Sequence, residues 1–276
     1  MNDHNIPPSL QGHAAHQQRY LQTLHAQPYY DLMAPAIERF LTQIIRSGAF
    51  YLRVHESTLE GILHSQSIKS LMEVGQGATN GGRDTRMEST AALYGCDVTK
   101  LKPEEYPKYG FLSQSDPEKD LLLNAQMWCQ YGDVSIKLNK ERLLHRTTLT
   151  VGNSLNFGRC YALVPTRVDE VKATCLCGPR HTEKGLVRMK DPMGLYAYFT
   201  TLILEGKLTE RNFPRIESIA GEAASFFEYF ELQYHGPLSL TDDVERIDLQ
   251  APSPSPELKA LQQQFEDIGV PFYLHK

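Results

Sequence analysis

Short strand-like runs constrain the fold of this chain more than any other feature of its sequence. β-Branched or aromatic residues, separated by turn residues, dominate segments 49–54, 109–112, 133–138, 146–151, 160–164 and 228–235. Such runs are typical of β-strands. They follow one another without a regular βαβ rhythm and without an internal repeat. The sequence therefore predicts an α+β architecture with a mostly antiparallel core.

Helical signals fall between these runs. Apolar residues recur at helical spacing in segments 29–47, 83–94, 191–206 and 257–267. The Ser57-x-x-Glu60 pattern is typical of a capping box and predicts a short helix from there to Leu63. A Pro/Ser-rich linker, 251–256, precedes the last helix, and a final strand, VPFYLH, follows it.

Composition narrows the class of protein. The chain has 276 residues, 28 Lys and Arg against 33 Asp and Glu, and 41% hydrophobic residues, which is enough to fill a core. Its net charge of −5 argues against binding nucleic acid by charge alone. No run of about 18 apolar residues predicts a membrane span. Five cysteines are sparse and odd in number, as suits a reduced compartment.

The domain organisation expected from this pattern is simple. Residues 1–28 are polar and rich in His and Gln, and they lack the basic and apolar regions of a Sec signal peptide. We expect a flexible leader there, either a frayed terminus or an export signal for a specialised secretion system. Residues 29–276 are expected to form one domain.

Two tempting motifs fail on their spacing. Gly75-Gln-Gly77-Ala-Thr-Asn80 resembles a dinucleotide fingerprint, but Asn80 stands where the third glycine belongs. Cys175-Leu-Cys177 is tighter than a structural zinc pair, and no second pair follows it. Neither a Rossmann site nor a metal site is therefore expected.

Three strand segments combine polar groups with apolar neighbours. Alternation places Arg53 and His55 on one face of the first, and Thr148 and Thr150 on one face of the second. Glu231, Gln233 and His235 share a face of the third. Taken singly, these segments also fit an exposed edge pair, the ordinary β-propensity of threonine and a solvated surface.

Taken together and in this order, the three segments have the layout of mono-ADP-ribosyltransferases. The runs GGRDTRMESTAALYG, PKYGFL, QYGDVSIKLNKERLLHRTTLTVGNS and ELQYHGPLSLTDDVERI resemble an uncharacterised bacterial domain family distantly related to those enzymes. The chain as a whole resembles a bacterial effector family that ADP-ribosylates a threonine of host ubiquitin. The resemblance covers roughly residues 50–250.

The resemblance implies an ADP-ribosyltransferase-like split β-sheet core with flanking helices, in which NAD+ is clamped in a bent conformation between two small sheets. Arg53 would anchor a phosphate and His55 the adenosine ribose, and which of them is the main anchor stays open. Thr148 would brace the catalytic acid. Thr150 and His235 are expected beside NAD+, and so is Glu88, unless Glu88 is a solvated helix carboxylate.

The resemblance assigns the catalytic acid to the Glu231-x-Gln233 segment. The usual signature is Glu-x-Glu or Gln-x-Glu with the essential acid second, so the order is reversed here. Glu231 is the expected acid, with Glu228 and Glu222 in reserve. A base, His235 or Glu228, would take the proton of the acceptor hydroxyl.

The implied reaction is consistent with these residue types. Cleaving the bond between nicotinamide and ribose develops positive charge on the sugar, which a fixed carboxylate stabilises. NAD+ would be a co-substrate, with no metal, and host ubiquitin the partner, with no nucleic acid and no membrane. The protein would be secreted by a bacterial secretion system into the host cytosol, where it would block ubiquitination. Alternatives are a non-catalytic NAD-binding or interaction protein on the same scaffold, and an NAD glycohydrolase.

Overall fold

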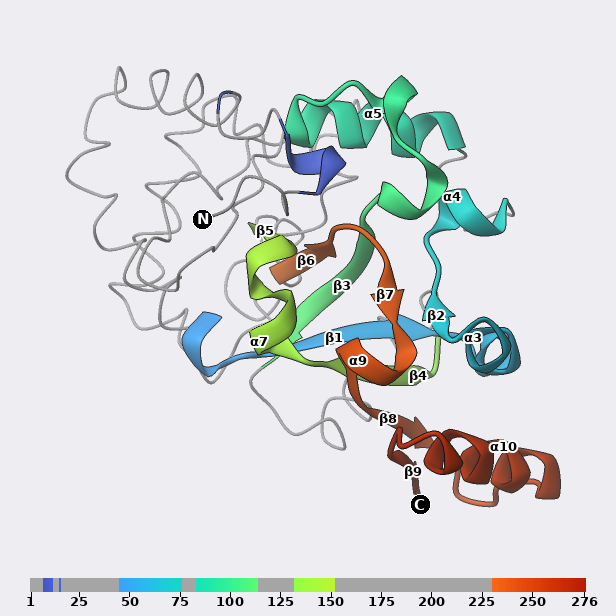
Figure 1. The fold of residues 1–276 in the computed structure, drawn as a ribbon. Helices are drawn as coiled ribbons and strands as arrows, with labels where there is room; N and C mark the ends of the chain where they lie inside the picture. The colour runs from blue at the N-terminus through green and yellow to red at the C-terminus, as the bar shows by residue number, and fades with distance from the viewer. Residues whose placement is uncertain (1–6, 12–14, 16–44, 76–82, 114–131, 152–229) are drawn as a thin grey trace, which may run out of the picture.

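A computed structural model describes residues 7–11, 15, 45–75, 83–113, 132–151 and 230–276 of this chain. These residues build a seven-stranded sheet with the strand order β5-β6-β3-β1-β4-β8-β9 (Figure 1). Its strands are β1 (Ala49–Val54), β3 (Lys108–Ser113), β4 (Val134–Leu138), β5 (Thr147–Val151), β6 (Phe230–Tyr234), β8 (Val244–Gln250) and β9 (Phe272–His275). A separate two-stranded sheet pairs β2 (Ser67–Ile68) with β7 (Leu238–Ser239).

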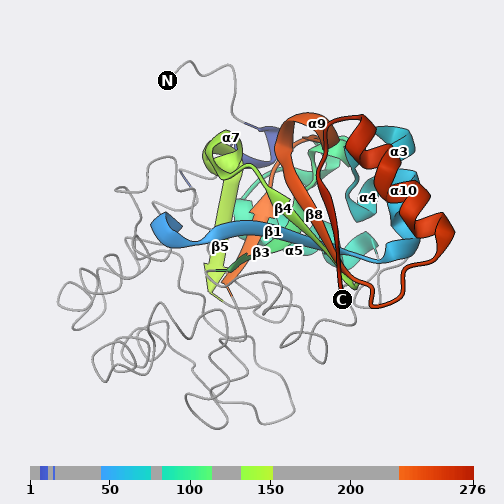
Figure 2. The ribbon, with the colours of Figure 1, turned by 90° about the horizontal axis from the view of Figure 1, so that it is seen from below.

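The pairing confirms an α+β fold with a mostly antiparallel sheet. Each ladder of the large sheet is antiparallel except β8–β9, whose strands are parallel and joined through α10 (Pro256–Asp267). A parallel pair needs such a crossover, because a tight hairpin turn reverses the chain direction. Figure 2 shows α10 and β8 at one end of the sheet and β5 at the other.

The remaining described helices are short apart from α5 (Arg83–Tyr94). The α-helices are α3 (Leu59–Ser65), α4 (Leu71–Val74), α7 (Lys140–Leu143) and α9 (Leu240–Asp243), and the 3₁₀ turns are η2 (Pro8–Leu10), η3 (Glu56–Thr58), η4 (Val98–Lys100), η5 (Pro103–Glu105) and η7 (Leu144–Arg146). None of them has the length and apolar character that a bilayer-spanning segment needs. The strand expected at 160–164, the helix expected at 191–206 and most of the one at 29–47 lie outside the described residues.

The predicted capping box at Ser57 is wrong. A 3₁₀ turn, η3, already occupies Glu56–Thr58, so Ser57 lies inside a turn and cannot precede the first turn of α3. The N-cap of α3 is Thr58, whose hydroxyl donates instead to the backbone oxygen of His55 at 2.7 Å. Glu carboxylates accept from N-cap amides at two other places: Glu73 lies 2.6 Å from the nitrogen of Ser70 at the start of α4, and Glu105 lies 2.7 Å from that of Lys102 at the start of η5.

Strand alternation gives the sheet two different faces. One face is apolar and buried, and α10 packs on it through Phe265, whose ring lies 5.6 Å from that of Phe272. Its other members include Phe50, Leu52, Leu112, Ile136, Leu138, Leu149, Leu232, Ile247 and Leu249. The opposite face carries aromatic and polar side chains, among them Tyr51, Arg53, Thr148, Glu231 and Gln233. Part of this polar face is covered by α5.

The sheet opens between β1 and β3. These strands pair from Ala49–Ser113 to Tyr51–Phe111, whereas β1 stays paired with β4 as far as Val54 and β3 with β6 as far as Lys108. Gly110 lies where β1 and β3 part. A Cβ on Gly110 would collide with the backbone oxygen of Tyr51 and the ring of Tyr234. Its absence lets Tyr234 cross β3 and donate to that oxygen, 3.1 Å away.

Candidate active site

A chain of buried polar side chains runs across β6 and β5. The carboxamide nitrogen of Gln233 lies 2.8 Å from Oε1 of Glu231, and its oxygen lies 2.7 Å from the hydroxyl of Thr148. The hydroxyl of Thr148 also lies 3.0 Å from Nε2 of His235. Nδ1 of His235 lies 2.7 Å from the hydroxyl of Ser9 in η2. Glu231 is 3% exposed and the other four residues are fully buried, so this chain is part of the interior.

The helix α5 completes this chain from the side. The hydroxyl of Tyr94 lies 3.3 Å from that of Thr148, and its ring meets the imidazole of His235 edge-on, with centroids 4.6 Å apart. Burial is the main cause that raises the pKa of Tyr94 well above 10.0, so Tyr94 stays a neutral donor. Thr148 therefore accepts from two groups and donates to one, which uses the full capacity of a hydroxyl.

The raised pKa of Tyr94 makes a pH-dependent prediction. The folded state favours the protonated phenol, so this contribution to stability is present below pH 10.0 and is lost as the pH rises above it. We expect the free energy of unfolding to fall more steeply in wild type than in Tyr94→Phe over this range. Denaturant titrations from about pH 8 to about pH 11 measure both slopes. Equal slopes would contradict the expectation.

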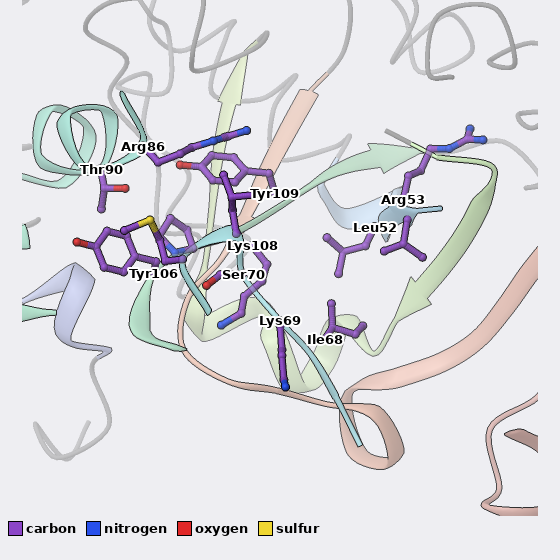
Figure 3. Close-up of a pocket in the computed structure, with 14 residues that line it drawn as sticks. Leu52, Arg53, Ile68, Lys69, Ser70, Arg86, Thr90, Tyr106, Lys108 and Tyr109 are labelled. Atoms are coloured by element: carbon purple, nitrogen blue, oxygen red, sulfur yellow. The ribbon is translucent and has the colours of Figure 1, made fainter. Parts of the chain in front are cut away.

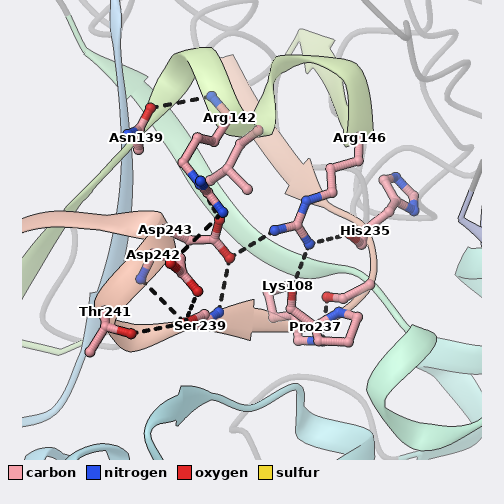
Figure 4. A network of polar contacts seen from close by, with 12 residues as sticks. Lys108, Asn139, Arg142, Arg146, His235, Pro237, Ser239, Thr241, Asp242 and Asp243 are labelled. Atoms are coloured by element: carbon pink, nitrogen blue, oxygen red, sulfur yellow. Dashed lines mark hydrogen bonds and ion pairs between the residues drawn. The ribbon is translucent and has the colours of Figure 1, made fainter. Parts of the chain in front are cut away.

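A second polar network fixes the end of β6 (Figure 4). The guanidinium of Arg146 donates to the backbone oxygens of His235 and Pro237, and it pairs with Asp243 at 2.8 Å. The ammonium of Lys108 donates to the backbone oxygen of Gly236 at 2.8 Å. Two cations thus hold the turn that follows His235, and so help to fix where β6 ends.

A cavity lies where β1 and β3 part (Figure 3). Its walls come from Leu52–Val54, Ile68–Met72 and Pro107–Tyr109, together with Arg86, Thr90 and Tyr106. Four of its lining residues are cationic, namely Arg53, Lys69, Arg86 and Lys108, and none is acidic. Its volume of about 130 Å³ is below that of a site enclosing a drug-sized ligand, so it suits one anionic part of a larger molecule.

The four cationic side chains around this cavity differ in the contacts that they make with the rest of the protein. Arg53 donates through Nε to the backbone oxygen of Gly132 at 3.0 Å. The ammonium of Lys108 pairs with Glu73 at 3.3 Å, and burial lowers its pKa. The side chain of Arg86 lies beside the ring of Tyr109 (Figure 3), and the distance from its guanidinium carbon to the ring centroid is 4.6 Å. Lys69 is exposed. The two arginines are thus the cations with donors best suited to a phosphate.

Three buried polar atoms on one side of the cavity make no hydrogen bond of normal geometry among the described residues. They are Nε of Arg86, Oγ1 of Thr90 and the hydroxyl of Tyr109. Thr90 and Arg86 still lie near enough to the hydroxyl of Tyr109 to oppose the rise in its pKa. Buried polar atoms are normally paired, so a cluster of three beside a cavity marks a surface suited to a polar ligand. Thr90 is only 1% exposed.

Tyr109 links the cavity to the buried acid. It lines the cavity and lies opposite Gln233 in the β3–β6 ladder. Burial raises its pKa, the charge of Arg86 opposes that rise, and the charge of Glu231 adds to it. The carboxylate of Glu231 is therefore close enough to act electrostatically on the cavity wall.

The structure brings some predicted site residues together and leaves others apart. Thr148, Glu231, Gln233 and His235 form one chain, but both ring nitrogens of His235 are engaged there, which leaves no ring nitrogen to act as an acceptor's base. Arg53 lines the cavity.

The other expected residues lie elsewhere. His55 and Glu88 are exposed and are not among the lining residues. β1 ends at Val54, before His55. The strand alternation that was expected to place His55 on the same face as Arg53 therefore does not extend to His55. Thr150 lies opposite Glu231 in the β5–β6 register, although its side chain is not described. Glu222 and Glu228 lie outside the described residues.

The sequence reasoning missed several residues at this site. Arg86, Thr90 and Tyr94 recur every four residues, a spacing that places them on one face of a helix. That signal was present in the run GGRDTRMESTAALYG. Ser9 carries no comparable signal, because it reaches His235 across 226 positions of sequence.

Comparison with known proteins does not assign this chain to a family. No known protein family and no curated protein matches this sequence. Within the described ranges, no group of three or more His, Cys, Asp or Glu side chains is arranged to hold a metal ion.

Proposed function

We propose that this protein is an NAD-dependent mono-ADP-ribosyltransferase with an ADP-ribosyltransferase-like split sheet. The observation that carries the proposal is the placement of a cation-lined, acid-free cavity next to a buried carboxylate on a neighbouring strand, with Tyr109 between them. The resemblance implies NAD+ held between two small sheets, and the parting of β1 from β3 supports such an arrangement.

Each part of the site has a role in this reaction. Arg53 and Arg86 hold the negatively charged pyrophosphate, because guanidinium groups match phosphate oxygens. Glu231 stabilises the positive charge that develops on the ribose as nicotinamide leaves. A carboxylate already fixed by Gln233 needs little reorganisation at that moment, and this favours the transition state over the ground state.

The acceptor in this proposal is a threonine of host ubiquitin, reached by secretion of the protein into a host cell. This part rests on the resemblance. The test is incubation of the full chain with NAD+ and ubiquitin, followed by intact-mass measurement and assay of free nicotinamide. One added ADP-ribose per ubiquitin supports the proposal. Nicotinamide release without a modified ubiquitin supports an NAD glycohydrolase, and no release at all supports a non-catalytic protein.

The cationic cavity makes a binding prediction. Replacing Arg86 by methionine keeps an aliphatic stem over Tyr109 but removes the charge. The charged hydrogen bonds it removes are worth about 1.5–3 kcal/mol, which corresponds to roughly 10- to 150-fold weaker NAD+ binding in calorimetry. Lys259→Met on α10 is the matched control, because Lys259 is exposed and outside the cavity. Equal NAD+ affinities for the two variants would show that Arg86 does not bind NAD+.

A further inference from the structure

The buried polar chain that begins at Glu231 continues past His235 into the N-terminal segment. Ser9 belongs to η2, far from the strands in sequence, and it is fully buried with its hydroxyl 2.7 Å from Nδ1 of His235. Leu10 beside it is buried as well. Part of the expected leader, residues 1–28, is therefore packed against the core at this point.

The direction of each hydrogen bond follows from the chemistry of its partners. Gln233 turns its amide nitrogen toward Oε1 of Glu231, which accepts, and its oxygen toward the hydroxyl of Thr148. Thr148 must then donate its single proton to that oxygen, 2.7 Å away. This leaves Thr148 an acceptor toward Nε2 of His235, which must carry the proton.

The same argument reaches Ser9. Full burial disfavours a charged imidazolium at His235. A neutral imidazole with a proton on Nε2 has a bare Nδ1, which can only accept. The hydroxyl of Ser9 must therefore donate to it. Four successive hydrogen bonds point in one direction, from Ser9 through His235, Thr148 and Gln233 to the carboxylate of Glu231.

We propose that Ser9 and His235 are positioning residues that fix the orientation of the Gln233 carboxamide, and through it the catalytic carboxylate, so that the N-terminal turn η2 is a working part of the active site. This inference rests on the proposed function. Neither Ser9 nor His235 lines the cavity. They act through Thr148, whose donor direction they determine, since a serine donor at Nδ1 favours the tautomer that donates from Nε2.

The kinetic test compares Ser9→Ala with Ser9→Thr, which keeps the hydroxyl. Nicotinamide release from NAD+ is measured with the full chain. We expect Ser9→Ala to lower kcat about tenfold with KM for NAD+ little changed, because a small misplacement of a catalytic group costs rate more than binding. Ser9→Thr should retain most of the wild-type kcat. A Ser9→Ala variant with wild-type kcat would overturn the inference.

A matched control separates positioning from lost stability. Ser255→Ala removes the hydroxyl that caps α10, where it accepts from the amide of Leu258 at 3.1 Å. This variant should be less stable than wild type yet keep its kcat. If both serine variants lose kcat in proportion to their stability, the role of Ser9 is structural and the inference fails.

A spectroscopic measurement on the wild type keeps the inference testable if Ser9→Ala does not fold. Nitrogen-15 NMR distinguishes the tautomers of histidine, and His235 should be neutral at pH 7, with a protonated Nε2 and a bare Nδ1. The opposite tautomer or an imidazolium would overturn the inference. A wild-type chain that releases no nicotinamide overturns the proposed function, and this inference with it. An active wild type with an insensitive Ser9 overturns this inference alone.

Discussion

Replacing Glu231 by glutamine is expected to slow nicotinamide release from NAD+ by on the order of 100- to 1,000-fold, while NAD+ affinity and the free energy of unfolding stay close to those of wild type. Glutamine matches glutamate in size, and its oxygen can still accept from the nitrogen of Gln233, 2.8 Å from Oε1 in the native chain. The change removes the negative charge and one of the two acceptor oxygens. That charge matters most when the ribose becomes cationic, so the effect falls on kcat.

The controls for this prediction are two further Glu→Gln changes. Glu60 is exposed on α3, and its variant should behave as wild type. Glu88 is exposed on α5 and lies outside the cavity, yet it was expected from the resemblance to face NAD+. Calorimetry and steady-state kinetics on all three variants identify the acid. A near-normal rate for Glu231→Gln, together with a large loss of rate for Glu88→Gln, would show that the catalytic acid is Glu88 on α5.

The hydrogen bonds of Gln233 in this structure explain the reversed order of the Glu231-x-Gln233 segment. Gln233 is fully buried and bonded on both sides, to Glu231 and to Thr148. An amide can bridge these two groups because it offers both a donor and an acceptor. A second carboxylate at that position would face the first at close range and would accept from both sides, which is unfavourable. The chain thus requires a neutral side chain at 233 and places the charge at 231.

Much of the sheet could be predicted from local patterns. The strands at 109–112, 133–138 and 146–151 and the final strand were found because alternation and β-branched residues are local signals. Helix α10 was found because its apolar spacing follows a Pro/Ser linker. The predicted start of α3 was wrong, because a 3₁₀ turn and a capping box have similar sequence patterns.

The site was only partly predictable, for a different reason. Alternation correctly grouped Glu231, Gln233 and His235 on one face, but alternation does not say what covers that face. The cover is α5 and η2, which contribute Tyr94 and Ser9 through contacts between distant parts of the chain. The cavity depends on where β1 and β3 stop pairing, and this is set by Gly110 and Tyr234 rather than by any motif.

Replacing Thr148 by valine is expected to lower the free energy of unfolding by roughly 2–5 kcal/mol, because the buried partners of a single hydroxyl all lose it at once. Gln233 loses a donor at 2.7 Å, His235 an acceptor at 3.0 Å and Tyr94 an acceptor at 3.3 Å. Valine has nearly the same shape as threonine, so the loss measures hydrogen bonding rather than a cavity. Denaturant unfolding at neutral pH gives the value.

The matched variant for this prediction is Thr148→Ser, which removes a methyl group but keeps the hydroxyl. It should cost about 1 kcal/mol, the transfer free energy of one buried carbon. The difference between the two variants isolates the hydroxyl, and nicotinamide release should follow it, falling far more in Thr148→Val than in Thr148→Ser. If the free energy of unfolding falls equally in both variants, packing contributes more to stability at this strand than the hydrogen bonds of Thr148 do. The carboxamide of Gln233 would then be held by something other than Thr148, and the path from η2 to Glu231 would be broken at its centre.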